Sequence, residues 1–136
     1  MKLLNNLYRI SERETTPCSF SPYSFSPIKY GIVLEEKSFI YKAHFPDDPI
    51  TPGVCIIQIA KELLEDYAQK RYTIKTIKNV KFLNVISPVT TPHVVYVYDK
   101  IVVDEASKTC HLQVQVLAEE VLSAKLSFTC QEDANR

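Results

Sequence analysis

The sequence predicts an α+β fold in which a curled antiparallel sheet wraps around one long helix. Residues 54–69 contain neither proline nor glycine and form the one segment with the length and composition of a long helix. The first part of this segment is apolar on almost every side, so we expect protein to surround it. The strands are expected in later segments rich in valine, isoleucine and aromatic residues: 74–82, 94–103, 109–118 and 121–129.

The first third of the chain is predicted in shorter pieces. Residues 3–10 read as a helical turn that leads into a strand, and residues 30–34 and 39–43 read as two strands paired in a hairpin. Residues 17–28 contain two Ser-Phe-Ser-Pro repeats, and each Ser-Pro favours an extended or turn conformation, so we expect an irregular loop. Residues 131–136 are expected to be a disordered tail.

Composition limits the domain count and the classes of partner. The chain has 136 residues, of which 46% are hydrophobic, so we expect a single domain over residues 1–136 with a real core. Sixteen basic and sixteen acidic residues give no net charge, which argues against nucleic acid and anionic membranes as partners. The four cysteines show no metal-ligand spacing, and no apolar run is long enough for a signal peptide or a membrane span. A cytoplasmic protein with reduced thiols and no metal or cofactor is expected.

The most informative segment is residues 44–53, which read HFPDDPITPG and lead directly into the helix. Its three prolines, spaced three apart, exclude regular hydrogen-bonded structure, so a stiff loop carries His44. Gly53 is one of only two glycines and lies where the loop becomes helix. No side chain there obstructs the unpaired N–H groups of the first turn, which suit a polarised carbonyl oxygen.

This HFPxxPxxPG segment resembles the signature of the 3-hydroxyacyl-[acyl-carrier-protein] dehydratases, which are small hot-dog-fold enzymes of fatty-acid synthesis. Their motif reads HFPGxPxxPGV, and their helix continues to an acidic residue fourteen positions after the histidine. Residues 38–43 resemble the family's strand that delivers this histidine, and residues 81–88 resemble its KFxxPVxPGD strand. The sequence departs from the motif twice, because Asp47 replaces a glycine and Gln58 replaces the catalytic acid.

The resemblance implies three chemical roles. His44 would remove the Cα proton, since an imidazole titrates near working pH, and the N–H of Gly53 or Val54 would stabilise the enolate-like oxygen. An amide has no titratable proton, so Gln58 would only orient a hydroxyl or a water. His93 and His111 are expected to be structural. The expected catalytic residues are His44, Gly53 and Gln58, and the expected substrate-binding residues are Phe45, Val54, Ile57 and Phe82.

Several alternatives remain open at this point. Gln58 could simply begin a polar helix face that continues with Glu62 and Glu65, and we expect that face to meet water. Glu62, one turn after Gln58, could instead serve as a displaced acid. The chain could also be an acyl thioesterase, or a protein that binds acyl chains or acyl carrier protein without turnover. The expected partners are acyl carrier protein or an acyl-CoA thioester, and a second copy of the chain in a homodimer or a higher even-numbered oligomer.

Overall fold

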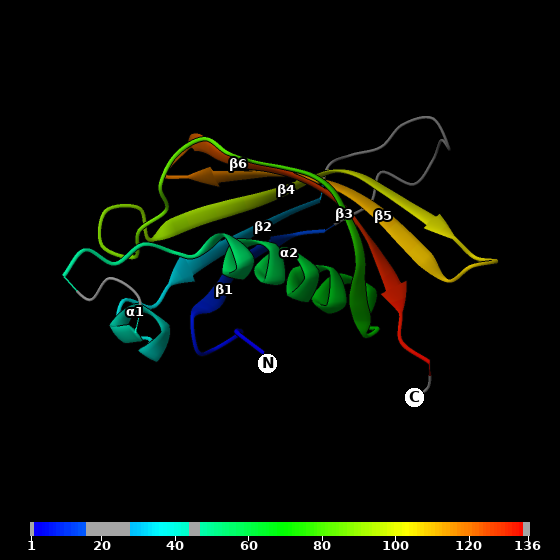
Figure 1. Cartoon of the computed structure of the whole chain (residues 1–136), viewed down its shortest axis with the longest axis horizontal. Helices are drawn as coiled ribbons and strands as arrows, with labels where there is room; N and C mark the ends of the chain where they lie inside the picture. Colours follow the sequence, from blue (N-terminus) through cyan, green and yellow to red (C-terminus); the bar gives the residue numbers. More distant parts are fainter. Residues whose placement is uncertain (1, 16–27, 44–46, 135–136) are drawn as a thin grey trace.

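The computed structural model describes residues 2–15, 28–43 and 47–134. They form a six-stranded antiparallel sheet with one long helix, α2, lying across one face (Figure 1). The strand order is β1-β2-β4-β5-β6-β3. This architecture confirms the predicted α+β hot-dog fold. The elements in chain order are β1 (Tyr8–Glu14), β2 (Ile28–Leu34), α1 (Phe39–Ala43), α2 (Gly53–Ala68), β3 (Tyr72–Phe82), β4 (His93–Asp104), β5 (Thr109–Ala118) and β6 (Val121–Glu132).

The C-terminal strands β5 and β6 agree closely with the strands expected from the sequence. The inner faces of β5 and β6 bury every second residue over most of their length, which is the period of an antiparallel sheet with one face against a core. Glu119 and Glu120 join these strands with φ of 48° and 70°, as a two-residue hairpin turn requires. β6 continues to Glu132, so the strand includes the first two residues of the expected tail.

The segment expected to be a second hairpin strand is a short helix instead. In α1, Ile40 and Tyr41 are neighbours in sequence and both are buried, whereas neighbouring residues of a strand point to opposite faces. The N–H of Tyr41 donates to the carbonyl oxygen of Ser38 at 3.1 Å, which begins the turn. β2 pairs with β1 and β4 rather than with this segment. Of the loop expected over residues 17–28, residues 17–27 lie outside the described residues, and Ile28 begins β2 instead.

Two tyrosines of β4 fix α2 on the sheet. Tyr96 and Tyr98 lie two residues apart, so both side chains project from the same face of the strand. Their hydroxyls donate to the carbonyl oxygens of Ile56 at 2.9 Å and Ala60 at 2.6 Å, which are one helical turn apart. Burial raises the pKa of both phenols. These bonds, together with the apolar packing of the helix on the sheet, set its position along the strands.

Two positions along α2 differ from the sequence expectation. Val54 is 73% exposed, so protein does not surround the beginning of the helix within one chain. Glu62, expected to meet water, is only 4% exposed. No helix in the described ranges is long and apolar enough to cross a membrane.

Candidate functional site

The candidate site begins where the proline-rich loop becomes α2. Pro52 precedes the helix with extended backbone angles, φ −61° and ψ 145°, and its carbonyl oxygen accepts from the N–H groups of Cys55 and Ile56. No described residue accepts a hydrogen bond from the N–H of Gly53 or Val54. The first turn therefore presents two donors at the positive end of the helix dipole, which is an arrangement that suits a carbonyl oxygen.

Phe82 lies directly against Gly53. A Cβ atom on Gly53 would be 2.8 Å from Cζ of Phe82, closer than real Cβ contacts allow. The absence of a side chain at this position therefore lets the aromatic ring approach the helix backbone. Phe82 as a whole is 51% exposed. Two residues expected at the site from sequence, Gly53 and Phe82, are thus brought together from α2 and the end of β3.

His44 and Phe45 lie outside the described residues, but the chain on both sides of them is held. The hydroxyl groups of Tyr41 and Thr51 share a hydrogen bond of 2.7 Å, and the N–H of Thr51 donates to the carbonyl oxygen of Ile86 at 2.8 Å. Burial raises the pKa of Tyr41 to about 12. Of the other histidines, His111 lies in β5 with Nδ1 3.0 Å from the Thr129 hydroxyl, and His93 begins β4.

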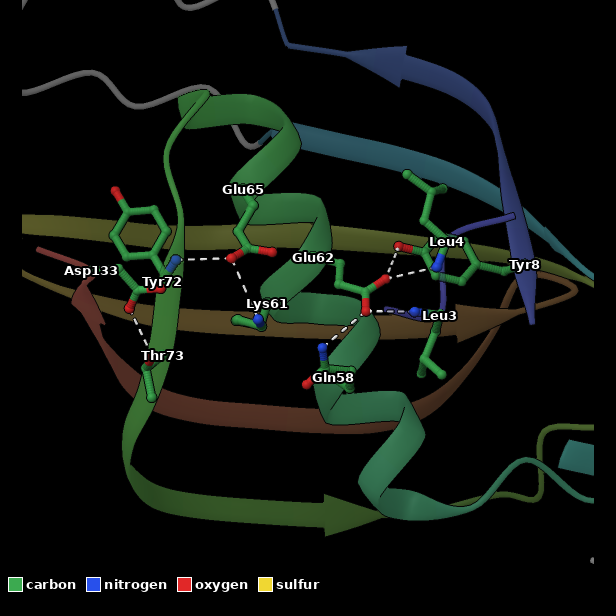
Figure 2. Close-up of polar contacts among 10 residues, drawn as sticks. All are labelled: Leu3, Leu4, Tyr8, Gln58, Lys61, Glu62, Glu65, Tyr72, Thr73 and Asp133. Atoms are coloured by element: carbon green, nitrogen blue, oxygen red, sulfur yellow. Dashed lines mark hydrogen bonds and ion pairs between the residues drawn. The ribbon is translucent and has the colours of Figure 1, made fainter. Parts of the chain in front are cut away.

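Gln58 is half-buried, and its side chain is bound to Glu62 one turn along the helix. Nε2 of Gln58 donates to Oε2 of Glu62 at 2.9 Å (Figure 2). Gln58 is therefore not simply the start of a solvated polar stripe, because the carboxylate that it contacts is buried. Ile57, the neighbouring residue expected to contact substrate, is also half-buried.

Glu62 also binds the N-terminal segment of the chain. Oε2 accepts from the N–H of Leu3 at 2.7 Å, and Oε1 accepts from the N–H of Leu4 and the hydroxyl of Tyr8, both at 2.9 Å. Burial, and then the charge of Glu62, raises the pKa of Tyr8. The sequence did not predict that Leu3, Leu4 and Tyr8 would bind the Glu62 carboxylate. Backbone N–H groups carry no sequence signal, and only the buried apolar residues of this segment could have suggested that it covers α2.

An open groove of about 610 Å³ runs beside Gln58 and away from the beginning of the helix. Its walls include Leu4, Gln58, Lys61 and Glu62, and none of Gly53, Val54, Ile57 or Phe82. Gln58 is five residues after Gly53, which corresponds to about 7.5 Å along the helix axis. Within one chain, the N–H groups of Gly53 and Val54 and the side chain of Gln58 therefore lie in separate surroundings. The described residues contain no cluster of three or more side chains suited to hold a metal ion.

Comparisons with known proteins agree with this architecture. A family model called ApeI-like, described as ApeI dehydratase, matches residues 24–119, which is more than half of the chain. A search of curated proteins found no match.

Three solved structures share the fold at low sequence identity. A chain of the dehydratase heterocomplex ApeI:P from Xenorhabdus doucetiae is 15% identical with a TM-score of 0.55, and the match covers 87% of this chain and 98% of that one. A protein described as a thioesterase, yhdA from Lactococcus lactis, is 12% identical with a TM-score of 0.66 and coverage of 97% and 98%. An uncharacterized protein from Erwinia carotovora subsp. atroseptica is 16% identical with a TM-score of 0.62 and coverage of 95% and 99%.

Proposed function

The chain belongs to the ApeI-like dehydratase family, and from this premise we propose that it dehydrates 3-hydroxyacyl thioesters carried by acyl carrier protein, in fatty-acid or related lipid biosynthesis. The observation that carries the proposal is the beginning of α2. Gly53 begins the helix against the ring of Phe82 and directly follows the sequence HFPDDPITP, and the N–H groups of Gly53 and Val54 have no described acceptor.

In the proposed reaction the thioester carbonyl oxygen accepts hydrogen bonds from the N–H of Gly53 or Val54. These donors stabilise the negative charge that develops on the oxygen when the Cα–H bond breaks. His44 takes the Cα proton as the general base. The electron pair forms the double bond between Cα and Cβ while the bond from Cβ to the hydroxyl oxygen breaks.

The departing hydroxyl must gain a proton to leave as water, and Gln58 has none to give. In the proposal its amide orients the departing hydroxyl, or a water molecule beside it, so that the proton taken by His44 is passed to the hydroxyl oxygen and the group leaves as water. Because one chain separates Gln58 from Gly53, we propose that the complete site forms between two copies of the chain. The exposed apolar side chains of Val54, Phe82 and Val85 near the beginning of α2 would then be covered.

The test is a single-turnover incubation with three substrates on acyl carrier protein: a 3-hydroxyacyl, a 2-enoyl and a saturated acyl chain. A dehydratase converts the first substrate into the second, hydrates the second in the reverse direction, and leaves the third intact. Release of free acid from the saturated substrate would identify a thioesterase instead. Stable complexes with all three substrates and no conversion would identify a binding protein.

A further inference from the structure

The carboxylate of Glu62 is surrounded by hydrogen-bond donors from two different parts of the chain. One donor, Nε2 of Gln58, belongs to the same helix, and the backbone N–H groups of Leu3 and Leu4 and the hydroxyl of Tyr8 belong to the N-terminal segment (Figure 2). A buried carboxylate is costly unless donors satisfy it. Among the described residues, no buried side-chain nitrogen or oxygen lacks a partner, so hydrogen bonds offset the desolvation cost of the Glu62 carboxylate.

This arrangement determines which way the amide of Gln58 points. An ionised carboxylate only accepts hydrogen bonds, so the NH₂ end of the amide must face Glu62. Figure 2 shows the amide oxygen turned away from Glu62. Without the carboxylate, the hydrogen bond that distinguishes the NH₂ end of the amide from its oxygen on this side would be lost.

We propose that Glu62 is a positioning residue, which fixes the amide of Gln58 for the dehydration step and is itself held by the N-terminal segment. The meaning of this role for catalysis rests on the proposed function. Glu62 does not touch the reacting atoms in this proposal, and it acts only through Gln58. Its removal should therefore slow the reaction only while Gln58 is present.

A double-mutant cycle on the full-length protein tests this dependence. Glu62→Gln should lower kcat by about tenfold to a hundredfold, the effect of misplacing a group in a site, with a smaller change in KM. In the Gln58→Ala background the same substitution should change kcat less than twofold. Glu65→Gln is the matched control, because Glu65 lies one turn further and contacts Lys61 and the N–H of Tyr72 instead. Equal losses of kcat in both backgrounds would overturn the proposal.

A second measurement does not depend on turnover. The side-chain amide signals of Gln58 in a ¹⁵N NMR spectrum can be assigned by their loss in Gln58→Ala. They should shift and exchange faster with water in Glu62→Gln, and stay unchanged in Glu65→Gln. If Glu62→Gln does not fold, Glu62→Asp keeps the charge but shortens the side chain, and the same changes are expected. Unchanged Gln58 signals in a folded Glu62 variant would overturn the positioning role, whereas a wild type without dehydration would refute only the proposed function.

Discussion

Gln58 and Glu62 form the hydrogen-bonded pair on which the proposed proton transfer depends. The helical spacing suggested that Glu62 continues a solvated stripe, because a helical wheel counts polarity and cannot show that another segment covers the residue. The structure corrects this expectation, since Glu62 is buried beneath the N-terminal segment and binds the Gln58 amide. Glu62 therefore contacts residue 58, the position at which the sequence motif leads us to expect an acid.

Replacing Gln58 with glutamate should create a proton-sharing pair. The new carboxyl would lie about where Nε2 of Gln58 now is, 2.9 Å from Oε2 of Glu62, and two carboxylates so close cannot both ionise. The pair should hold one proton near neutral pH. A positioned general acid typically raises the rate by about 10²- to 10⁴-fold, so dehydration by Gln58→Glu should be at least about tenfold faster than in wild type. The acceleration should disappear as pH rises and the shared proton is lost.

The measurement is the pH–rate profile of 3-hydroxyacyl dehydration for wild type and Gln58→Glu, with circular dichroism to confirm folding. The matched control is Gln58→Glu combined with Glu62→Gln, which has only one carboxyl at the pair and should not show the same pH dependence. A folded Gln58→Glu variant that is no faster than wild type at any pH would show that residue 58 is not the acid position.

At the scale of the elements, the sequence identified α2 and β3 to β6 but not α1. The long helix and the later strands have strong local patterns, whereas residues 39–43 are few and contain the aromatic and β-branched residues typical of strands. Their helical turn depends on burying Ile40 and Tyr41 side by side and on the bond from the Tyr41 hydroxyl to Thr51. Both are tertiary contacts, which a local pattern does not show.

Asp66 of α2 joins the helix to β1 and β2. Its carboxylate accepts two hydrogen bonds from Arg13, at 2.8 and 3.0 Å, and one from the Tyr30 hydroxyl at 2.7 Å. The hydrogen bonds from Arg13 and Tyr30 lower the pKa of Asp66 against the opposing effect of partial burial. The ionised form of Asp66 is therefore favoured more in the folded state than in the unfolded chain.

Asp66→Asn should lower the free energy of unfolding by about 1 kcal/mol at neutral pH, a modest value because Arg13 is half-exposed and solvent screens the pair. A lowered folded pKa means that the stabilisation is present above the unfolded value of about 3.9 and is lost as pH falls through the folded value. Urea unfolding from pH 7 to pH 2 should show the difference from wild type shrinking below about pH 4. A constant difference would contradict the account. Exposed Asp99→Asn is the control, since no described residue bonds its side chain.

At the scale of the whole molecule, the hot-dog architecture could be predicted from one long helix and several alternating strands, but the assembly could not. Among the described strands, β3 is at the edge of the sheet and pairs only with β6, so no described strand covers its other edge. Ile77, Phe82, Leu83 and Val85, on β3 and just after it, are at least half exposed. An open strand edge beside exposed apolar side chains favours association.

We therefore expect a homodimer or a higher even-numbered oligomer in solution, because most soluble homo-oligomers have closed symmetry and twofold dimers are the commonest. Light scattering at micromolar concentration should give a mass that is an even multiple of 15.6 kDa. Val85→Lys should shift the mass toward the monomer, because burying an unpaired charge in an interface is costly. Ala106→Lys, which adds the same charge at an exposed position in the turn between β4 and β5, is the matched control. A monomeric mass for wild type would contradict the expectation.

The most direct test of the account is the rate at which wild type and His44→Ala convert a 3-hydroxyacyl substrate on acyl carrier protein into the 2-enoyl product. His44 is the general base of the proposal, and the proline-rich sequence that follows it predicts no regular structure, so we expect the variant to keep the circular dichroism spectrum and unfolding midpoint of wild type. The account predicts measurable dehydration by wild type and its loss, by at least about a hundredfold, in the folded variant. Equal rates for the two proteins, or no dehydration by wild type, would contradict it.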